Sequence, residues 1–146
     1  PILRKDFIIN PYQILESKIY NADAILLITT ILNDDEIKEF ISLATQYNLD
    51  CLIEIHNEEE LKRAVNIDYP IIGINNRNLK NLNVDSNYAL NLINKIPKNF
   101  TIVAESGIKT KEDILKYNDA GVFNFLIGES ILKSSDISKK ITELLN

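Results

Sequence analysis

The sequence predicts an α/β fold with a parallel sheet, and two observations carry that prediction. Runs rich in Ile, Leu and Val recur roughly every 20 to 25 residues, and each run is almost continuously apolar. Such runs are typical of strands covered on both faces, because a strand with one wet face alternates apolar and polar residues. The stretches between the runs have the length and apolar spacing of amphipathic helices. The six expected strands lie at residues 1–3, 24–28, 51–55, 71–74, 101–105 and 123–127.

Three of the expected helices carry start signals. Asn33 and Asn57 each precede three acidic residues, the pattern of an N-cap followed by carboxylates in the first helical turn. Residues 110–113, Thr-Lys-Glu-Asp, are typical of a capping box that opens the helix after the fifth strand. The last helix is expected over residues 130–145, with a break near 134–136.

Length and composition favour one domain over residues 1–146 and exclude several classes of protein. With 45% hydrophobic and 25% charged residues, the chain is too apolar for a disordered protein and too interrupted by charge for a membrane span. A net charge of −5 argues against nucleic-acid and anionic-membrane partners. One Cys and one His exclude an internal disulfide, a cysteine-based zinc site and a multi-histidine metal site. The chain starts at Pro1 and contains no Met, which suggests that an N-terminal part is missing.

Six consecutive βα units with right-handed crossovers leave an open doubly wound sheet and a closed barrel as the common architectures. Four polar residues, each from a different unit, follow or end an apolar run: Lys5, Glu54, Asn75 and Glu105. In a barrel the carboxyl ends of the strands surround one mouth, where catalytic groups collect, so these positions favour the barrel. A complete barrel needs eight units and about 250 residues. Either two units are absent or the sheet is open.

Two turns after the last two strands are candidates for phosphate binding. Ser106-Gly107 follows the fifth strand, and Gly128-Glu129-Ser130 follows the sixth at the start of a helix. Barrels commonly bind phosphate there through backbone N–H groups, and glycine lets the backbone approach the anion closely. Both segments also fit ordinary βα turns. The Glu129 carboxylate would repel phosphate unless it points to solvent while its N–H donates.

Acid–base chemistry is the second candidate function of the polar residues. A lysine near two carboxylates stays protonated, so Lys5 could donate a proton or hold an anionic intermediate, although a plain surface pair with Asp6 is the alternative. Burial raises a carboxyl pKa and a nearby lysine lowers it, so Glu54 and Glu105 are each candidates for a general base. Asn75 can both donate and accept hydrogen bonds and could position substrate or a glutamate.

Other residues have less specific interpretations. Arg77 is either a planar clamp for an anion or a loop cation. His56 is expected to point to the side of the strand opposite Glu54, as a helix-start or packing residue. Cys51 is expected to fill core space, because it has no basic neighbour. Tyrosines 12, 47 and 117 lie in helical patterns and are interpreted as packing residues.

These motifs resemble those of the indole-3-glycerol phosphate synthases of tryptophan biosynthesis. The similar segments, which occur in order along the chain, are residues 3–9, 11–14, 22–28, 54–56, 73–79, 104–108 and 126–130. Among them, LRKDF (3–7) and INNRNL (74–79) are highly specific among phosphate-binding barrels. The resemblance implies an incomplete TIM (βα)8 barrel with six βα units, strands three to eight. It also implies a cytoplasmic carboxy-lyase that uses neither metal nor cofactor. The reaction would close a ring in 1-(2-carboxyphenylamino)-1-deoxyribulose 5-phosphate with loss of carbon dioxide and water.

The resemblance also implies a role for each candidate residue. Lys5 matches the general-acid lysine on strand three, and Glu54 matches a strand-five glutamate that acts as a base or proton relay in the dehydration. Which of Glu54 and Glu105 takes the proton stays open. The remaining matches are Asn75 and Arg77 for substrate contact, Glu105 and Ser106 for the site lining and the phosphate, and Gly107, Gly128, Glu129 and Ser130 for the phosphate turns.

The departure from the family pattern concerns strands one and two, which would precede Pro1. The family's strand one carries a Glu-x-Lys pair and a nearby serine that have no counterpart here. The 146-residue polypeptide alone is therefore expected to be inactive or nearly so, and addition of an N-terminal fragment is expected to restore turnover. An open barrel would expose strand edges at residues 1–7 and 123–127. The edges are expected to be covered by another copy of the chain, through those edges or the missing N-terminal segment, or by rearrangement of terminal segments.

Two alternatives remain at this point. Phosphoribosylanthranilate isomerase and other phosphate-binding barrels share the late phosphate turns but lack the LRKDF and INNRNL segments. A non-catalytic fragment or assembly partner is the other, and the presence of Lys5, Glu54, Asn75 and Glu105 argues weakly against it. A coding sequence upstream of Pro1 that encodes Glu-x-Lys and a following Ser-Pro would distinguish them.

Overall fold

The fold is seen in a computed structural model that describes residues 1–77 and 86–145, without the side chains of residues 86–88. The chain folds into two compact units. Unit 1 comprises Pro1–Gly73 and Pro97–Thr101, and unit 2 comprises Ile74–Ile96 and Ile102–Asn146. One domain over residues 1–146 remains a prediction.

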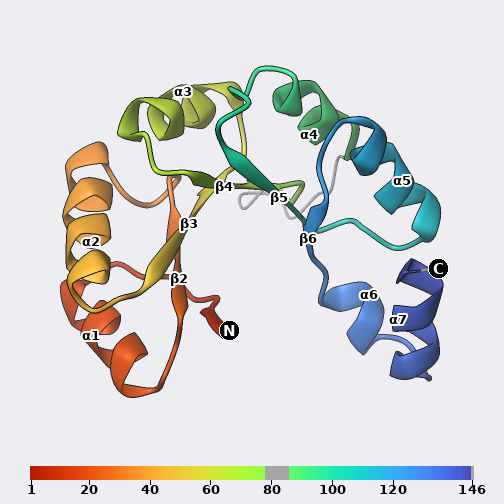
Figure 1. Ribbon diagram of the computed structural model, residues 1–146, viewed down its shortest axis with the longest axis horizontal. Helices are drawn as coiled ribbons and strands as arrows, with labels where there is room; N and C mark the ends of the chain where they lie inside the picture. The colour runs from red at the N-terminus through yellow and green to blue at the C-terminus, as the bar shows by residue number, and fades with distance from the viewer. Residues whose placement is uncertain (78–85, 146) are drawn as a thin grey trace. The chain divides into compact units, whose positions relative to one another are not determined.

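Strands and helices alternate along the described chain (Figure 1). The strands are β1 Leu3–Arg4, β2 Ala24–Ile28, β3 Asp50–Ile55, β4 Ile71–Asn75, β5 Thr101–Glu105 and β6 Asn124–Leu126. The helices are α1 Pro11–Ile19, α2 Asp34–Gln46, α3 Glu58–Ile67, α4 Ser86–Ile93, α5 Lys111–Asp119, α6 Glu129–Leu132 and α7 Ile137–Leu145.

The strand order decides between the two architectures that the sequence leaves open. The described strands follow one another in the order β1-β2-β3-β4-β5-β6, and β1 with β2, β2 with β3 and β5 with β6 pair in parallel. A doubly wound sheet reverses its strand order at a switch point, and no reversal occurs among these strands. The chain therefore has six consecutive βα units of a (βα)8 barrel, as predicted.

In unit 1, β2 and β3 are covered on both faces. Neighbouring residues of β2 point to opposite faces, yet Ile25, Leu26, Leu27 and Ile28 are all buried. Helices α1 and α2 pack beside each other along this part of the sheet (Figure 1). Register places Ile28 of β2 beside Glu54 of β3, so the two strands end at the same edge. Burial on both faces is the reason that the apolar run is continuous.

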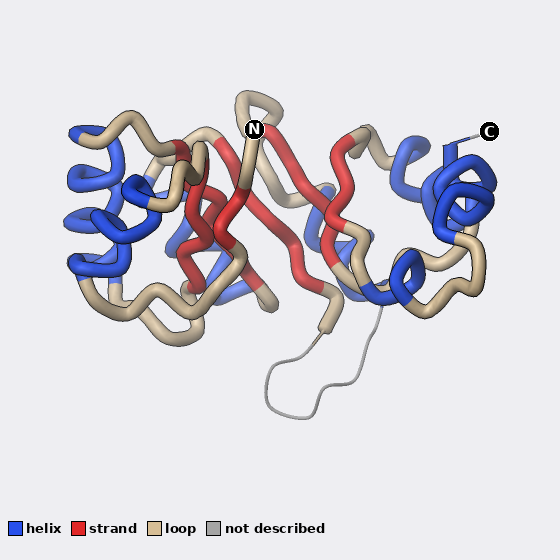
Figure 2. Tube along the Cα trace, turned by 90° about the horizontal axis from the view of Figure 1, so that it is seen from below, coloured by secondary structure: helices blue, strands red, loops and turns tan. Residues whose placement is uncertain are grey.

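In unit 2 the helices near the C-terminus group together, with α5 and α6 both against α7 (Figure 2). Tyr117 of α5 is buried, and its ring meets Phe125 of β6 edge to face at a centroid distance of 6.0 Å. The predicted break in the last helix is confirmed, because α6 ends at Leu132 and α7 begins at Ile137. Between them, Ser134 and Asp136 bond through the Ser134 hydroxyl, which donates to Asp136 O and accepts from Asp136 N–H.

Local signals located most elements correctly. The strands at 24–28 and 101–105 match the prediction residue for residue. The first and last strands are shorter than expected, since β1 is Leu3–Arg4 and β6 is Asn124–Leu126. Asn33, Asn57 and Thr110 are N-caps whose side chains accept the backbone N–H three residues on, and Asn33 and Thr110 form complete capping boxes.

Candidate active site

Lys5 and Glu54 lie at the carboxyl ends of two strands of unit 1 and form an ion pair. Lys5 follows β1 directly, and Glu54 is the last but one residue of β3. Lys5 Nζ lies 3.2 Å from Glu54 Oε2. The Glu54 side chain is 1% exposed, whereas 43% of the Lys5 side chain is accessible. A buried carboxylate with a partly accessible ammonium beside it can exchange a proton with a bound molecule.

His56 contacts the other oxygen of Glu54, which corrects the sequence-based expectation. Its Nε2 lies 3.2 Å from Glu54 Oε1. The expectation that His56 points to the opposite side was wrong, because residues two apart on an extended chain share a face. The other ring nitrogen, Nδ1, lies 3.2 Å from Glu60 Oε2 in the first turn of α3. His56 therefore joins two carboxylates that come from a strand and from the following helix.

Glu60 is buried and accepts several hydrogen bonds. Thr29 Oγ1 and the backbone N–H of His56 donate to one oxygen, at 2.9 and 2.8 Å, and Thr30 Oγ1 and Asn57 Nδ2 donate to the other, both at 2.9 Å. Burial alone would raise the pKa of Glu60, but hydrogen bonds from the ring and backbone of His56 and from Thr29 and Thr30 lower it to about 2. Burial alone would lower the pKa of His56, but the two carboxylates raise it to about 9. Both groups are therefore ionised at neutral pH.

Unit 2 contributes the end of β4 and the residues that follow it. Asn75, the last residue of β4, is buried and accepts the backbone N–H of Arg77 at 3.0 Å through Oδ1. The neighbouring Asn76 is also buried, and its Nδ2 donates to the backbone oxygens of Glu105 and Ser106 at 2.9 and 2.8 Å. Residues 78 and 79 of the INNRNL segment lie outside the described residues.

Asn76 ties the end of β4 to the end of β5. Its backbone N–H donates to Glu105 O at 2.9 Å, and its Oδ1 accepts from the Tyr117 hydroxyl at 2.9 Å. Tyr117 is buried, as its interpretation as a packing residue required. Its hydroxyl in addition holds the side chain of Asn76 in place. Ser106 and Gly107 both have positive φ, 63° and 75°, so the chain turns sharply directly after the buried Glu105. The Asn76 bonds brace a backbone conformation that a serine adopts at some cost.

The turn before α6 lies at the end of β6, and Arg77 contacts it. Arg77 forms an ion pair with Glu129, and Lys133 Nζ lies 2.6 Å from the same carboxylate. The hydrogen bond from Lys133 and then that from Arg77 lower the pKa of Glu129. With two cations beside it, the Glu129 side chain adds little net negative charge to the turn. The Ser130 hydroxyl donates to Ile108 O at 2.8 Å, which links this turn to the loop after β5.

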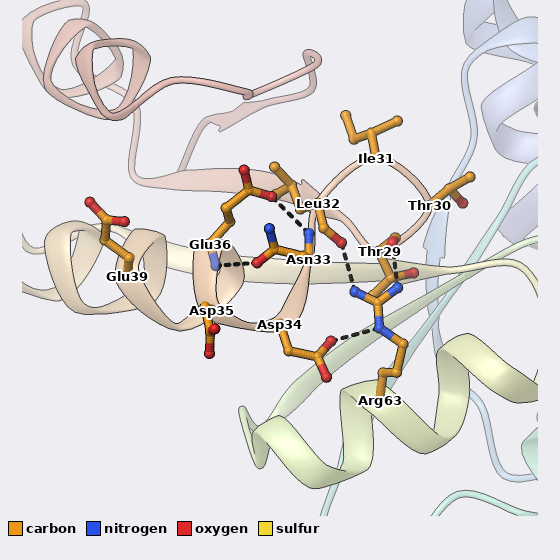
Figure 3. A pocket seen from close by; sticks show the side chains of 10 residues that line it. All are labelled: Thr29, Thr30, Ile31, Leu32, Asn33, Asp34, Asp35, Glu36, Glu39 and Arg63. Carbon is orange, nitrogen blue, oxygen red and sulfur yellow. Dashed lines mark hydrogen bonds and ion pairs between the residues drawn. The ribbon is translucent and has the colours of Figure 1, made fainter.

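A surface depression lies over the loop between β2 and α2 (Figure 3). Arg63 of α3 closes one side, donating to the backbone oxygens of Thr29 and Leu32 and to Asp34 at 2.7, 2.6 and 2.6 Å. The rest of the lining includes four acidic residues, Asp34, Asp35, Glu36 and Glu39. We interpret Arg63 as the group that fixes this loop beside Thr29 and Thr30, which in turn hold Glu60.

Neither the cysteine nor a cluster of metal-ligating side chains forms a second candidate site among the described residues. Cys51 is buried, and burial raises the pKa of its thiol to about 12, so it fills core space as expected. Within residues 1–77 and 86–145, no group of three or more His, Cys, Asp or Glu side chains could hold a metal ion. No helix in this described part has the length and apolarity needed to cross a membrane.

Comparison with known proteins identifies the family. The sequence profile of indole-3-glycerol phosphate synthase matches residues 1–144, almost the whole chain. The chain belongs to the indole-3-glycerol phosphate synthase family. It is 51% identical over 145 residues to the indole-3-glycerol phosphate synthase of Thermoanaerobacter sp. strain X514, a match that covers 99% of this chain and 55% of the relative. The synthase of Caldanaerobacter subterraneus is 52% identical over 136 residues, covering 93% of this chain and 53% of that relative.

The chain spans about half the length of the curated synthases that it matches. Among solved structures, it resembles a chain of the tryptophan synthase complex from Pyrococcus furiosus, with a TM-score of 0.74 and 17% identity. That match covers 99% of this chain and 66% of the other. At this identity the likeness concerns the fold alone, and it agrees with the strand order.

Each unit brings some of the predicted site residues together. Unit 1 pairs Lys5 with Glu54. Unit 2 places Asn75 and Glu105 at adjacent strand ends and joins Arg77 to Glu129. The catalytic and binding roles of these residues remain predictions. Sequence reasoning missed the residues that hold them in place, which are His56, Glu60, Asn76 and Tyr117. His56 could have been found from its spacing of two residues from Glu54, because residues two apart on an extended chain share a face.

Proposed function

We propose that this chain forms part of an indole-3-glycerol phosphate synthase active site. The observation that carries the proposal is the 3.2 Å pair between Lys5 and the buried Glu54, at strand ends of a chain that matches the family over residues 1–144. The substrate is 1-(2-carboxyphenylamino)-1-deoxyribulose 5-phosphate, and the products are indole-3-glycerol phosphate, carbon dioxide and water. The enzyme is cytoplasmic, and residues 1–146 form part of one barrel domain.

The ammonium of Lys5 acts as the general acid of ring closure. As the aromatic carbon that bears the carboxylate attacks the ketone carbon, Lys5 protonates the ketone oxygen and prevents a free alkoxide from forming. The carbon–carboxylate bond then breaks, carbon dioxide leaves and the bonding electrons return to the ring. The new hydroxyl group leaves as water after protonation, while a proton is removed from the neighbouring carbon. Glu54 or Glu105 takes that proton.

The residues of unit 2 bind the rest of the substrate in this proposal. Asn75 positions the substrate from the end of β4, and Arg77 and Ser106 contact its polar groups. Because Glu129 is neutralised by two cations, its backbone N–H can face an anion without strong repulsion from its side chain. The phosphate group is bound at the turns that contain Ser106, Gly107, Gly128, Glu129 and Ser130.

The partners of the protein follow from the same proposal. The phosphorylated substrate is its small-molecule ligand, and neither nucleic acid nor a membrane is a partner. A homo-oligomer that covers strand edges belongs to the proposal as well, and sedimentation that shows only a stable monomer would contradict that part.

The test is the conversion of the substrate by the protein expressed from its complete reading frame. We expect indole-3-glycerol phosphate to form, and we expect Lys5→Met to lower kcat by roughly 10²- to 10⁴-fold, because one general acid is lost. Lys38→Met removes an exposed lysine of α2 and is the matched control, with kcat unchanged. A folded protein without turnover, or Lys5→Met with full activity, would contradict the proposal. We further expect any coding sequence upstream of Pro1 to encode Glu-x-Lys and a following Ser-Pro.

A further inference from the structure

His56 lies between two carboxylates, and each of its ring nitrogens is close to one of them. Nε2 is 3.2 Å from Glu54 Oε1, and Nδ1 is 3.2 Å from Glu60 Oε2 and 3.1 Å from Thr30 Oγ1. A neutral imidazole has one N–H and can donate on one side only, whereas an imidazolium donates on both. Nε2 makes no hydrogen bond of acceptable geometry among the described residues, so its contact with Glu54 is an ion-pair contact by distance. The protonated ring fits this place because it puts a positive charge between two carboxylates.

The Glu60 side of this arrangement is rigid. Its carboxylate accepts four donors besides the ring: two threonine hydroxyls, one amide and one backbone N–H. Two of these donors, Thr29 and Thr30, lie in the loop that Arg63 fixes from α3. A carboxylate held by so many donors keeps both its charge and its orientation, and it therefore holds the His56 ring.

The Glu54 carboxylate connects His56 to Lys5, the proposed general acid. One oxygen of Glu54 faces His56, and the other faces Lys5. The carboxylate is thus held between two cations, and rotation about its last bond would break both contacts. The Thr29 hydroxyl also lies 2.8 Å from the backbone oxygen of Glu54, and it shares its single hydrogen between this oxygen and Glu60.

We infer that His56 is a positioning residue, whose protonated ring, held by Glu60, orients the Glu54 carboxylate toward Lys5. The inference deepens the proposed function and rests on it for the catalytic part. The charged groups around the ring are Glu54 from β3, Glu60 from α3 and, beyond Glu54, Lys5 after β1. The raised pKa of His56, about 9, agrees with a ring that stays protonated over the neutral range.

The first experiment measures the titration of His56 by NMR. His56 is the only histidine of the 146 residues, so its ring resonances are identified by their loss in His56→Gln. We expect a midpoint near pH 9, and we expect Glu60→Gln to move it toward the ordinary value of about 6.5. Glu59→Gln, which removes an exposed acid from the same helical turn, is the matched control and should leave the midpoint unchanged. A midpoint near 6.5 in the unmodified protein would overturn the inference.

The second experiment follows kcat against pH in the protein expressed from its complete reading frame. In Glu60→Gln, we expect kcat at pH 8 to fall roughly ten- to a hundredfold and to recover toward pH 6, as the ring regains its proton. The unmodified protein and Glu59→Gln should keep their activity up to about pH 9, where His56 titrates. His56→Gln should be impaired without the recovery at low pH. A purely structural role predicts losses that do not follow the His56 titration, and such a result would overturn the inference.

A third measurement separates this inference from the proposed function. The side-chain carboxyl ¹³C resonance of Glu54 should shift at the midpoint of the His56 titration, and this needs no turnover. If the protein lacks synthase activity while the Glu54 resonance follows His56, the proposed function fails and the coupling of the two residues stands. If the protein is active but the Glu54 resonance does not shift at the midpoint of the His56 titration, the inference fails and the proposed function stands.

Discussion

The two units hold their candidate residues by different means. In unit 1, charges alternate along a chain of contacts from Lys5 through Glu54 and His56 to Glu60. In unit 2, the neutral side chains of Asn76 and Tyr117 hold the backbone at the ends of β4 and β5. The charged contact between Arg77 and Glu129 lies at a more exposed position of the same unit.

The difference teaches which interactions respond to pH. An ion-pair chain depends on the protonation of every member, and one proton gained or lost changes all of its contacts. Amide and hydroxyl groups keep their hydrogen bonds across the ordinary pH range. Unit 1 should therefore respond to pH between neutrality and pH 9, whereas the contacts of Asn76 should not.

The largest expected effect comes from removing the amide in unit 2. Asn76→Ala leaves the buried Tyr117 hydroxyl and the backbone oxygens of Glu105 and Ser106 without this partner, which should lower the free energy of unfolding by about 2–4 kcal/mol. Urea unfolding at pH 6 and pH 9 should give the same loss at both. A loss confined to one pH would break the contrast between the units.

Removal of a single hydroxyl group tests the contribution of the Asn76 contacts more closely. Tyr117→Phe removes one hydroxyl and leaves the Asn76 oxygen without its donor, so about 1 kcal/mol should be lost. Tyr12→Phe is the matched control, because Tyr12 is 67% exposed, and its unfolding free energy should not change measurably.

The second effect is the pH dependence of unit 1. The pKa of His56 is raised from 6.5 to about 9 in the folded state, so its contribution to stability is complete below pH 6.5 and is lost as the pH rises through 9. Glu60→Gln should therefore destabilise the protein most near pH 6, and the difference should shrink toward pH 10. Allowing for solvent screening, we expect this pH-dependent part to be of the order of 1 kcal/mol.

Unfolding of the unmodified protein, Glu60→Gln and Glu59→Gln across pH 3–10 measures this effect. The same carboxylate has its pKa lowered from 4.5 to about 2, so below pH 4.5 the stabilisation by Glu60 should also fade. A constant difference between Glu60→Gln and the unmodified protein at every pH would contradict the ionic account of unit 1.

The smallest effects compare two glycines of unit 2. Gly121 has φ +84°, a backbone conformation that alanine adopts at some cost, and Gly121→Ala should lose about 1 kcal/mol of stability. Gly128 has φ −117° and open space where a Cβ would lie, so Gly128→Ala should change stability by less than about 0.5 kcal/mol. If the turn binds phosphate, Gly128→Ala should nevertheless raise KM for the substrate, and an unchanged KM would contradict that role.

Local sequence was sufficient for the elements and for the ends of several helices. The run Ala24–Ile28 and the caps Asn33, Asn57 and Thr110 were predicted where the structure has them. Strand length was harder at β1 and β6, where Ile2 and Phe123 are apolar but exposed and lie outside the strands. Apolarity predicts burial only where another element is present to cover the residue.

Prediction of the candidate site was uneven for a related reason. Lys5 and Glu54 were found because parallel strands end at one edge, so their positions in the chain already imply nearness. The side of His56 was wrongly predicted, although the spacing of two residues was enough to place it beside Glu54. The bond between Asn76 and Tyr117 joins residues 41 positions apart, and no local pattern indicates it.

The amino-acid sequence by itself determined the alternation of strands and helices, the caps and the strand-end positions of the polar residues, because these depend on neighbours within a few positions along the chain. Only the tertiary structure decided that Glu60 holds His56 against Glu54, and that Asn76 rather than Asn75 joins the ends of β4 and β5. The physical reason is that a buried polar group needs a partner in space, and folding brings that partner from another element of the chain.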